Sequence, residues 1–382
     1  MADSPSLTEP FEELSLDELR RRTSIKWTMY EPDVLPLWVA EMDVAPVPSV
    51  VAALERAVRA GDLGYPPMDD SYAESFAAVA ARRWGWAVDV DGTSLAADVL
   101  TGVREALLAA TGPGDGILLP TPVYHPLVDM PASIGRRLVT CPLTEEGRLD
   151  LGAIAAGLQD PSVRAVLLCS PHNPTGVVHT REELAELAGL AARHDVEVVV
   201  DEIHALLVPD SSRFVPWLTV SPRGLVVTSA SKAYNMAAIK AAIVVAGESS
   251  REPLARMPET LRWGASHLGV IAHRAAWDGG DAWIDAVNGA VAENAAYLSS
   301  LLAEHLPGVV YRGQQATYLA WLDCRALGLG DDPSVVFRER GRVALNPGPE
   351  FGPGGEGHVR LNIAASRATL TEAVRRMAGS IE

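Results

Sequence analysis

Two polar residues in the middle of the chain follow apolar runs and could do chemistry. Lys232 lies just after the run LVVT, next to Ser229 and Ser231. A lysine becomes a nucleophile or a proton acceptor when burial or neighbouring cations keep its amine uncharged. Asp201 follows the run VEVVV, and a carboxylate at the end of a buried strand needs a partner. These residues make covalent or acid–base chemistry on a small molecule the first hypothesis.

Two further segments suit the binding of polar groups. The segment SPHNPTG, residues 170–176, contains prolines that would hold Asn173 rigidly after the run LLCS. Upstream, we predict a strand at 98–100 that turns through Gly102 directly into a helix. Backbone N–H groups at such a turn suit a phosphate, although a glycine there is more often only a turn.

An alternation of strands and helices must position these residues. Short apolar runs alternate with helical stretches between residues 98 and 247, which is typical of βαβ units. The runs lack the polar alternation of a half-exposed sheet, so helices should cover both faces. We therefore predict an α/β fold, a three-layer sandwich around a mostly parallel sheet, with the polar residues at the carboxyl ends of its strands. The expected strands are 98–100, 117–119, 164–169, 196–200, 225–229 and 241–246, and the clearest helix is 181–194.

The chain is long enough for a second folding unit. Its 382 residues exceed the roughly 250–300 at which a single core stops growing. We predict an N-terminal segment at 1–47 that joins the small domain, a large domain at 48–284 and a smaller α+β domain at 285–382, with a cleft between the domains. The helices expected outside the alternating region are 48–60, 71–84, 282–305, 333–341 and 370–378, and the late strands are 309–312, 317–323, 343–346 and 358–363.

Charge and composition exclude several classes of function. Lysine and arginine number 32 against 49 acidic residues, so the net charge of −17 opposes binding to nucleic acid or to acidic lipid. Three scattered cysteines without a CxxC pair predict neither a disulfide framework nor a thiolate metal site. The segment 1–19 is rich in acidic residues and does not match a signal peptide. The apolar runs of the chain are too short to cross a bilayer. We expect a cytoplasmic protein with no membrane, metal or nucleic-acid partner.

The ordered set of motifs resembles the fold type I pyridoxal 5'-phosphate enzymes, the aspartate aminotransferase superfamily, over nearly the whole chain. The resemblance narrows to the MalY/PatB group of carbon–sulfur lyases, which are cystathionine β-lyase-like. It rests on Lys26-Trp27, LWVAEMD at 37–43, GYP at 64–66, DEIH at 201–204 and RLN at 360–362. The group's WVADMDF stands here as WVAEMDV, so Glu41 and Val44 depart from it. Ordinary aminotransferases of the superfamily usually have tyrosine where His204 stands.

The resemblance implies a role for each residue around the cofactor ring. Lys232 would form the Schiff base with the cofactor, and Asp201 would pair with the protonated pyridine nitrogen. Asn173 and His204 would approach the phenolic oxygen, and Tyr124 would stack on the ring. From the residues alone, structural roles stay open: a capping carboxylate for Asp201, a hydrogen-bonded core histidine for His204 and a core tyrosine for Tyr124.

The resemblance also implies how the phosphate is held. It would lie on the backbone amides of Gly102, Val103 and Arg104, with Ser229 donating a hydrogen bond. Lys240 would supply the counter-charge where many relatives carry arginine. Ser231 completes the cofactor-binding set on this subunit. Tyr65 would reach the phosphate of the neighbouring subunit, which implies a homodimer with shared active sites.

The implied substrate is an amino acid. Arg360 would bind its α-carboxylate through a two-pronged pair, and Trp38 and Ala40 would border it. A salt-bridged structural arginine and a packing tryptophan are the alternatives for Arg360 and Trp38. The implied activity is cleavage of L-cystathionine or a related L-cysteine S-conjugate to a thiol, pyruvate and ammonia. Alternatives are an aminotransferase, a decarboxylating variant from secondary metabolism, or a regulatory protein-binding role.

Overall fold

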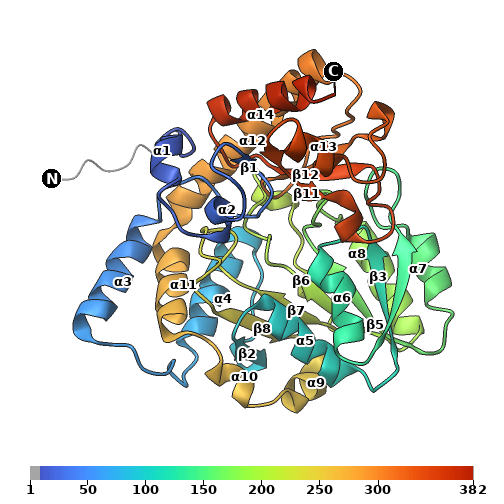
Figure 1. Ribbon diagram of the computed structural model, residues 1–382. Helices are drawn as coiled ribbons and strands as arrows, with labels where there is room; N and C mark the ends of the chain where they lie inside the picture. The colour runs from blue at the N-terminus through green and yellow to red at the C-terminus, as the bar shows by residue number, and fades with distance from the viewer. Residues whose placement is uncertain (1–8, 382) are drawn as a thin grey trace.

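The computed structural model describes residues 9–381, and within them seven strands form one central sheet (Figure 1). The strand order is β2-β8-β7-β6-β5-β3-β4. β8 runs antiparallel to both its neighbours, and the other pairings are parallel. The strands are β2 (Thr93–Ala96), β3 (Gly116–Thr121), β4 (Arg137–Pro142), β5 (Val163–Cys169), β6 (Glu197–Asp201), β7 (Leu225–Thr228) and β8 (Ala242–Ala246).

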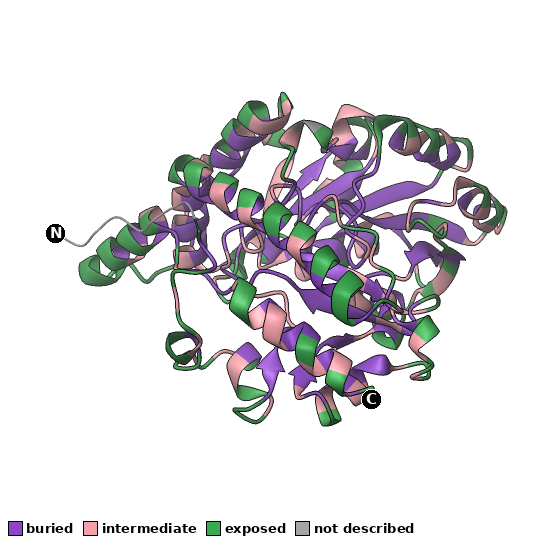
Figure 2. Cartoon of the chain, turned by 90° about the horizontal axis from the view of Figure 1, so that it is seen from above, coloured by how far each residue is buried: buried purple, intermediate pink, exposed green. Residues whose placement is uncertain are grey.

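Helices cover both faces of this sheet because both faces are apolar. Val199 of β6 packs into one buried cluster, whereas Val198 and Val200 pack into another on the opposite face. The first cluster receives α5 (Val99–Ala110), α6 (His125–Ser133), α9 (Arg251–Arg256) and α10 (Thr260–Trp263). The second receives α3 (Pro48–Ala60), α4 (Ser71–Trp84), α7 (Leu151–Gly157), α8 (Arg181–Arg193) and α11 (His267–Gly279). The predicted three-layer α/β sandwich is confirmed, and Figure 2 shows the buried strands between helices that are buried on their inner sides.

A smaller α+β unit follows α12 (Asp281–His305). Its antiparallel sheet has the order β11-β12-β9, in which Arg360 lies opposite both Trp321 and Asn346. The N-terminal strand β1 (Leu35–Pro36) pairs in parallel with β10 of this unit. The remaining elements are α1 (Leu16–Leu19), α2 (Ile25–Thr28), β9 (Leu319–Asp323), α13 (Pro333–Glu339), β10 (Val343–Ala344), β11 (Asn346–Pro347), β12 (His358–Asn362) and α14 (Arg367–Gly379). The domain boundaries at 47 and 284 stay a prediction.

The predicted strand at 98–100 is wrong. Asp98 is the N-cap of α5, because its side chain accepts a hydrogen bond from the Thr101 amide, and the helix begins at Val99. The segment 309–312 is not a strand either, since Val310 forms a single bridge with Asp323. The expected strand at 343–346 divides into β10 and β11.

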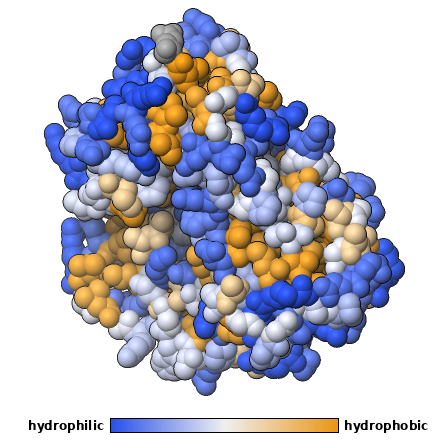
Figure 3. All heavy atoms as spheres, turned by 45° about the vertical axis from the view of Figure 1, so that its right-hand side comes forward, coloured by the Kyte–Doolittle hydropathy of each residue, from blue (hydrophilic) through white to orange (hydrophobic). Residues whose placement is uncertain are grey.

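On the face shown in Figure 3, hydrophilic side chains dominate and apolar ones form separate patches. Part of the acidic segment that argued against a signal peptide, residues 1–8, lies outside the described residues. Between residues 9 and 381, no helix combines the length and apolar character needed to span a membrane.

Candidate active site

A cavity of about 120 Å³ lies at the carboxyl ends of the central strands. It gathers residues that follow three neighbouring strands: Asn173 after β5, Asp201 at the end of β6 and Lys232 after β7. Of the residues predicted for the site, it is lined by Ala40, Tyr124, Asn173, Asp201, His204, Ser231, Lys232 and Lys240. The predicted residues that do not line it are Trp38, Tyr65, Gly102, Val103, Arg104, Ser229 and Arg360.

Lys232 has the electrostatic surroundings of a reactive amine. Its Nζ donates a hydrogen bond of 3.1 Å to the carbonyl oxygen of Ala40. Burial, and then the charges of Arg360 and Lys240, lower the pKa of Lys232 to about 8. A lysine with this pKa supplies uncharged amine close to neutral pH, which a surface lysine does not.

Asp201 is a buried carboxylate without an ion pair among the described residues. One of its oxygens accepts a hydrogen bond of 3.0 Å from the backbone amide of Ile203. Burial raises the pKa of Asp201 to about 6, although that bond and the charge of Lys232 act in the opposite direction. A cationic partner brought into the cavity would stabilise its charged form.

Arg360 is the matching buried cation on the small unit, with 3% of its surface exposed. Its Nη1 donates to Asn173 Oδ1 at 3.0 Å, and its Nη2 donates to Asn346 Oδ1 at 2.7 Å and to the Trp38 carbonyl at 3.2 Å. Burial lowers the pKa of Arg360 to about 10. Within the described part of the chain no carboxylate pairs with it, and its Nε has no hydrogen-bond partner. The site therefore holds a desolvated guanidinium that suits an anionic ligand.

His204, after β6, and Tyr124, before α6, also line the cavity. Burial lowers the pKa of His204 to about 3, so its ring is neutral at physiological pH. Its Nδ1 is buried, and no described residue hydrogen-bonds to it. Tyr124 precedes α6, and its backbone amide donates to the carbonyl of Asn173 at 2.9 Å. Burial raises the pKa of Tyr124, which keeps the phenol protonated.

The amino end of α5 faces the cavity three residues earlier than predicted. Val99 and Leu100 line the cavity, and the first N–H groups of a helix have no partner inside it. Gly102 lies one turn further on, where an added Cβ would approach Val227 to 2.7 Å, so glycine permits the helix to pack on β7. Val103 is fully buried in the core, and Arg104 pairs on the surface with Glu105. At this end of α5 the residues that line the cavity are therefore Val99 and Leu100 and not 102–104, and the predicted phosphate site at 102–104 stays a prediction.

Two further residues modify this end of the cavity. Lys240 lies with its Nζ 3.4 Å from Asp98 Oδ2, so its charge is shared with the helix cap. The Ser229 hydroxyl donates a hydrogen bond of 2.8 Å to the carbonyl oxygen of Ala241, so its proton already has an acceptor within the protein. Ser231 lines the cavity, and its amide donates to Ser229 Oγ at 3.1 Å. Sequence reasoning missed Asp98, although an aspartate that begins a helical stretch is a common capping signal.

The segment 38–43 that carries Ala40 is anchored from several sides. Asn362 donates to the carbonyls of Val39 and Glu41 at 2.9 and 2.7 Å. Lys26 forms a buried ion pair with Asp43. Trp38 contributes its backbone carbonyl to Arg360, while its ring meets Tyr30 edge to face. These contacts position the Ala40 carbonyl toward Lys232.

Tyr65 lies outside the cavity of its own chain. It follows α3, is 76% exposed and meets the Trp263 ring edge to face at 5.8 Å between centroids. An exposed tyrosine on this segment is available to another molecule.

The family of the chain follows from comparison with known proteins. Residues 32–377 match the model of the family described as aminotransferase class I and II. The chain belongs to this family. A Mycobacterium tuberculosis protein assigned as a cystathionine beta-lyase is 45% identical over 403 residues, which cover 98% of this chain and 99% of that protein. Cystathionine beta-lyase PatB of Bacillus subtilis is 33% identical over 91% of this chain and 93% of its own length.

The family's structures agree with the fold. A Corynebacterium diphtheriae protein assigned as a PLP-dependent beta-cystathionase superposes with a TM-score of 0.91 and 34% identity, covering 98% of this chain and 99% of the other. The predicted resemblance to fold type I enzymes of the MalY/PatB group is confirmed. The residue roles that the resemblance implies stay predictions.

Proposed function

We propose that the chain is a pyridoxal 5'-phosphate-dependent carbon–sulfur lyase that converts L-cystathionine or a related L-cysteine S-conjugate to a thiol, pyruvate and ammonia. The observation that carries the proposal is the meeting of three groups without their usual partners: the amine of Lys232, the carboxyl of Asp201 and the guanidinium of Arg360. The names of the relatives, cystathionine beta-lyase at 45% and 33% identity, support this substrate class.

The cavity fits the ring of this cofactor. Asp201 would pair with the protonated pyridine nitrogen, which its lack of an ion pair favours. Asn173 and the unpartnered His204 would face the phenolic oxygen, and Tyr124 would cover the ring. When bound, the cofactor supplies an aldehyde that joins to amines and a ring that takes up the electrons released at Cα.

The amino end of α5 fits the phosphate. Helix N-termini favour anions because their free N–H groups and dipole point outward. The amides of Val99 and Leu100 would bind the phosphate oxygens, and Lys240 would supply a positive charge. Ser231 would contribute its hydroxyl. Asp98 opposes this binding, since its carboxylate shares Lys240.

Lys232 and Arg360 would divide the work on the substrate. Arg360 would bind the α-carboxylate through Nη1 and Nη2, replacing its present bonds to amide and carbonyl oxygens. Lys232 would accept the Cα proton at Nζ, which its lowered pKa allows near neutral pH. Departure of the thiolate from Cβ would then complete the elimination. Ala40 and Trp38 would border the substrate and exclude water from that side.

Incubation of the purified holoenzyme with L-cystathionine alone tests the activity. A lyase releases thiol and pyruvate in equal amounts without a second substrate, measured with a thiol reagent and with lactate dehydrogenase. An aminotransferase uses the same cofactor contacts but forms little product until a keto acid is added. Product that depends on the keto acid would therefore overturn the lyase proposal and leave the cofactor assignment intact.

The proposed assembly is a homodimer with shared active sites. Exposed apolar side chains gather on α3, the segment after it and α10, and they include Val58, Leu63, Tyr65, Met68 and Trp263. Burial against a second copy would remove this surface from water, and Tyr65 would reach the partner's phosphate. Sedimentation of an active monomer at assay concentration would contradict the shared site.

We also propose that the enzyme acts in the cytoplasm, which three scattered cysteines without a CxxC pair support.

A further inference from the structure

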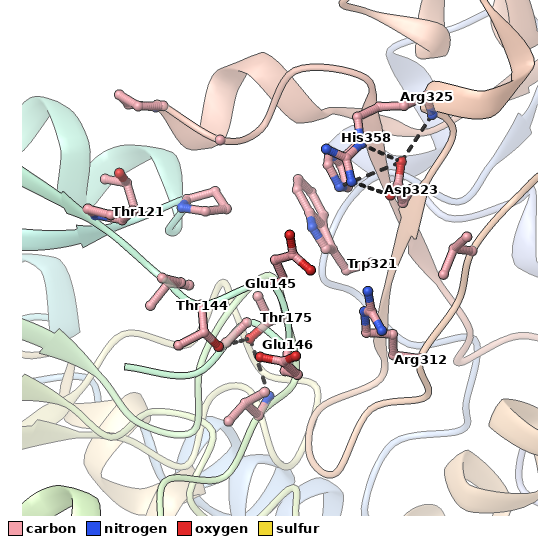
Figure 4. Close-up of a pocket in the computed structure, with 18 of the residues that line it drawn as sticks. Thr121, Thr144, Glu145, Glu146, Thr175, Arg312, Trp321, Asp323, Arg325 and His358 are labelled. Carbon is pink, nitrogen blue, oxygen red and sulfur yellow. Dashed lines mark hydrogen bonds and ion pairs between the residues drawn. The ribbon is translucent and has the colours of Figure 1, made fainter. Parts of the chain in front are cut away.

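A second cavity of about 450 Å³ lies between the large and small units (Figure 4). The large unit lines it with the ends of β3 and β4, the turn at 144–147 and residues 175–177. The small unit lines it with residues 310–313, β9 and the segment 353–358. Among the described residues, none lines both this cavity and the candidate active site.

Charges of opposite sign face each other across the second cavity. Glu145 and Glu146 project from the turn of the large unit, and Arg312 projects from the small unit (Figure 4). In the part of the chain that the structure describes, no ion pair is formed by any of these three side chains. Hydrogen bonds from its own backbone and from Thr144, and the nearby charge of Arg312, lower the pKa of Glu146, so it remains charged at neutral pH.

The wall between these charges is aromatic. The Trp321 ring stacks on His358 with centroids 5.0 Å apart and planes 6° apart. Beyond the stack, Arg325 is already paired with Asp323, with 2.7 Å between Nη2 and Oδ2. The stack therefore offers an apolar surface, and the unpaired charges lie on the two sides of the opening.

The charge balance selects the class of ligand. The lining carboxylates Glu145, Glu146 and Asp323 outnumber the guanidiniums of Arg312 and Arg325. A polyanion such as a nucleotide phosphate would meet net repulsion in this cavity. A simple cation would compete with Arg312 for Glu146 and would supply no acceptor for the guanidinium of Arg312. A ligand with one ammonium and one carboxylate satisfies both walls.

We propose that this cavity is a second ligand site, which binds a small zwitterionic α-amino acid. The ammonium group lies at Glu145 and Glu146, the carboxylate at Arg312 and the apolar side chain against Trp321. Because both units contribute contacts, the bound amino acid bridges them. The proposal does not depend on the reaction catalysed, since binding is measured without turnover.

The second site is connected to the candidate active site through the chain itself. Two segments supply one residue to each cavity: Thr121 and Tyr124 on one segment, and Thr175 and Asn173 on the other. A third segment, β12, carries His358 of the second cavity and Arg360, which donates a hydrogen bond to Asn173 of the active-site cavity. A ligand that moves these segments in one site would change the geometry of the other site. If ligand binding at one site changes the affinity of the other, the reverse effect is equally large.

L-methionine is a suitable probe. It is zwitterionic, its thioether packs well on an indole ring, and its sulfur lies on Cγ, so it carries no β-thiolate to release. Isothermal titration of the Arg360→Ala holoenzyme measures the second site after carboxylate capture in the active site has been removed. We expect one methionine per chain to remain bound in this variant.

Substitutions in the second cavity decide the assignment. In the Arg360→Ala background, Glu145→Gln with Glu146→Gln should weaken methionine binding about tenfold or more, as should Arg312→Gln. Glu186→Gln, an exposed carboxylate on α8 away from the cavity, is the matched control and should leave binding unchanged. Methionine affinity that survives all the cavity substitutions would overturn the proposal.

Two analogues test the ligand class. The decarboxylated analogue 3-(methylthio)propylamine and the deaminated analogue 4-(methylthio)butanoate each lack one of the two charges. Each should bind about tenfold more weakly than methionine. Equal binding of the amine would identify a cation site instead and refute the zwitterion assignment, as would an Arg360→Ala chain that binds no methionine.

Discussion

Replacement of Arg360 is the sharpest test of how the substrate is held. The side chain is buried, and its two terminal nitrogens are bound only to neutral oxygens of Asn173, Asn346 and Trp38. Exchange of two of these bonds for bonds to a carboxylate makes them charged at both ends. Hydrogen bonds to charged groups contribute about 1.5–3 kcal/mol each, so two of them contribute about 3–6 kcal/mol before the exchanged bonds are subtracted.

A net loss of about 3 kcal/mol in Arg360→Ala corresponds to a fall in kcat/KM on the order of a hundredfold. Arg360→Lys keeps the charge but not the planar fork, and should fall between alanine and wild type. The assay is steady-state kinetics with L-cystathionine, with the visible absorbance of the bound cofactor recorded for each variant. Visible absorbance should persist in both variants, because Lys232, which would hold the cofactor, is unchanged.

The alanine change also has a structural consequence, which needs its own control. It leaves the oxygens of Asn173 and Asn346 without a donor, and an unsatisfied buried polar group costs about 1–3 kcal/mol. We therefore expect a lower melting temperature, and the kinetics belong well below it. If both variants bind amino acid ligands as tightly as wild type while folded, the carboxylate has another partner and this orientation of the substrate is wrong.

Four other predictions concern residues that line the cavity or lie next to a lining residue in the sequence. Lys232→Ala should abolish turnover and the borohydride-stable attachment of cofactor seen by mass spectrometry. In the wild-type chain, a pKa of about 8 for Lys232 makes the rate of cofactor uptake rise about tenfold from pH 7 to 9 and then level off; a continued rise to pH 10 would contradict it. Asp98→Asn keeps the helix cap but frees Lys240, so pyridoxine 5'-phosphate should bind about twofold to fivefold more tightly by equilibrium dialysis. Burial raises the pKa of Glu202 to about 8, so its folded form prefers the proton and stability falls as pH rises from about 4.5 to 8. Glu202→Gln should therefore raise the melting temperature more at pH 8.5 than at pH 4.5, and an equal change at both would refute the shift.

Much of the site could be predicted from the sequence because it depends on strand ends. Asn173, Asp201 and Lys232 each follow an apolar run, and the carboxyl ends of β5, β6 and β7 meet at one edge of the sheet. The helices at 48–60 and 71–84 were also predictable, since a terminal glycine follows each of them.

Side-chain direction and long-range partners were not predictable in this way. The apolar pattern could not distinguish a strand at 98–100 from the first turn of α5, so the predicted start of this helix was three residues too late. Ser229 points toward Ala241 because the local turn sets its direction, which periodicity does not record. Two of the partners of Arg360 are distant in the sequence, Trp38 by 322 positions and Asn173 by 187 positions, so no local pattern connects them to Arg360.

The three central groups share one physical property, and it explains why they lie together. Burial raises the pKa of Asp201 and lowers the pKa values of Lys232 and Arg360, in each case in favour of the uncharged form. In a buried ion-pair network with a purely structural role, neighbouring ions of opposite charge would oppose those pKa shifts. Here the opposing charges are distant or absent among the described residues, so the folding chain bears the cost of desolvation without full compensation. In the proposed function, a ring nitrogen for Asp201, an aldehyde for Lys232 and a carboxylate for Arg360 would each supply the missing partner, and each binding step would then recover part of that free energy. The same argument predicts that cofactor and substrate stabilise the fold in succession, with the cofactor acting through the large unit and the substrate drawing the small unit onto it.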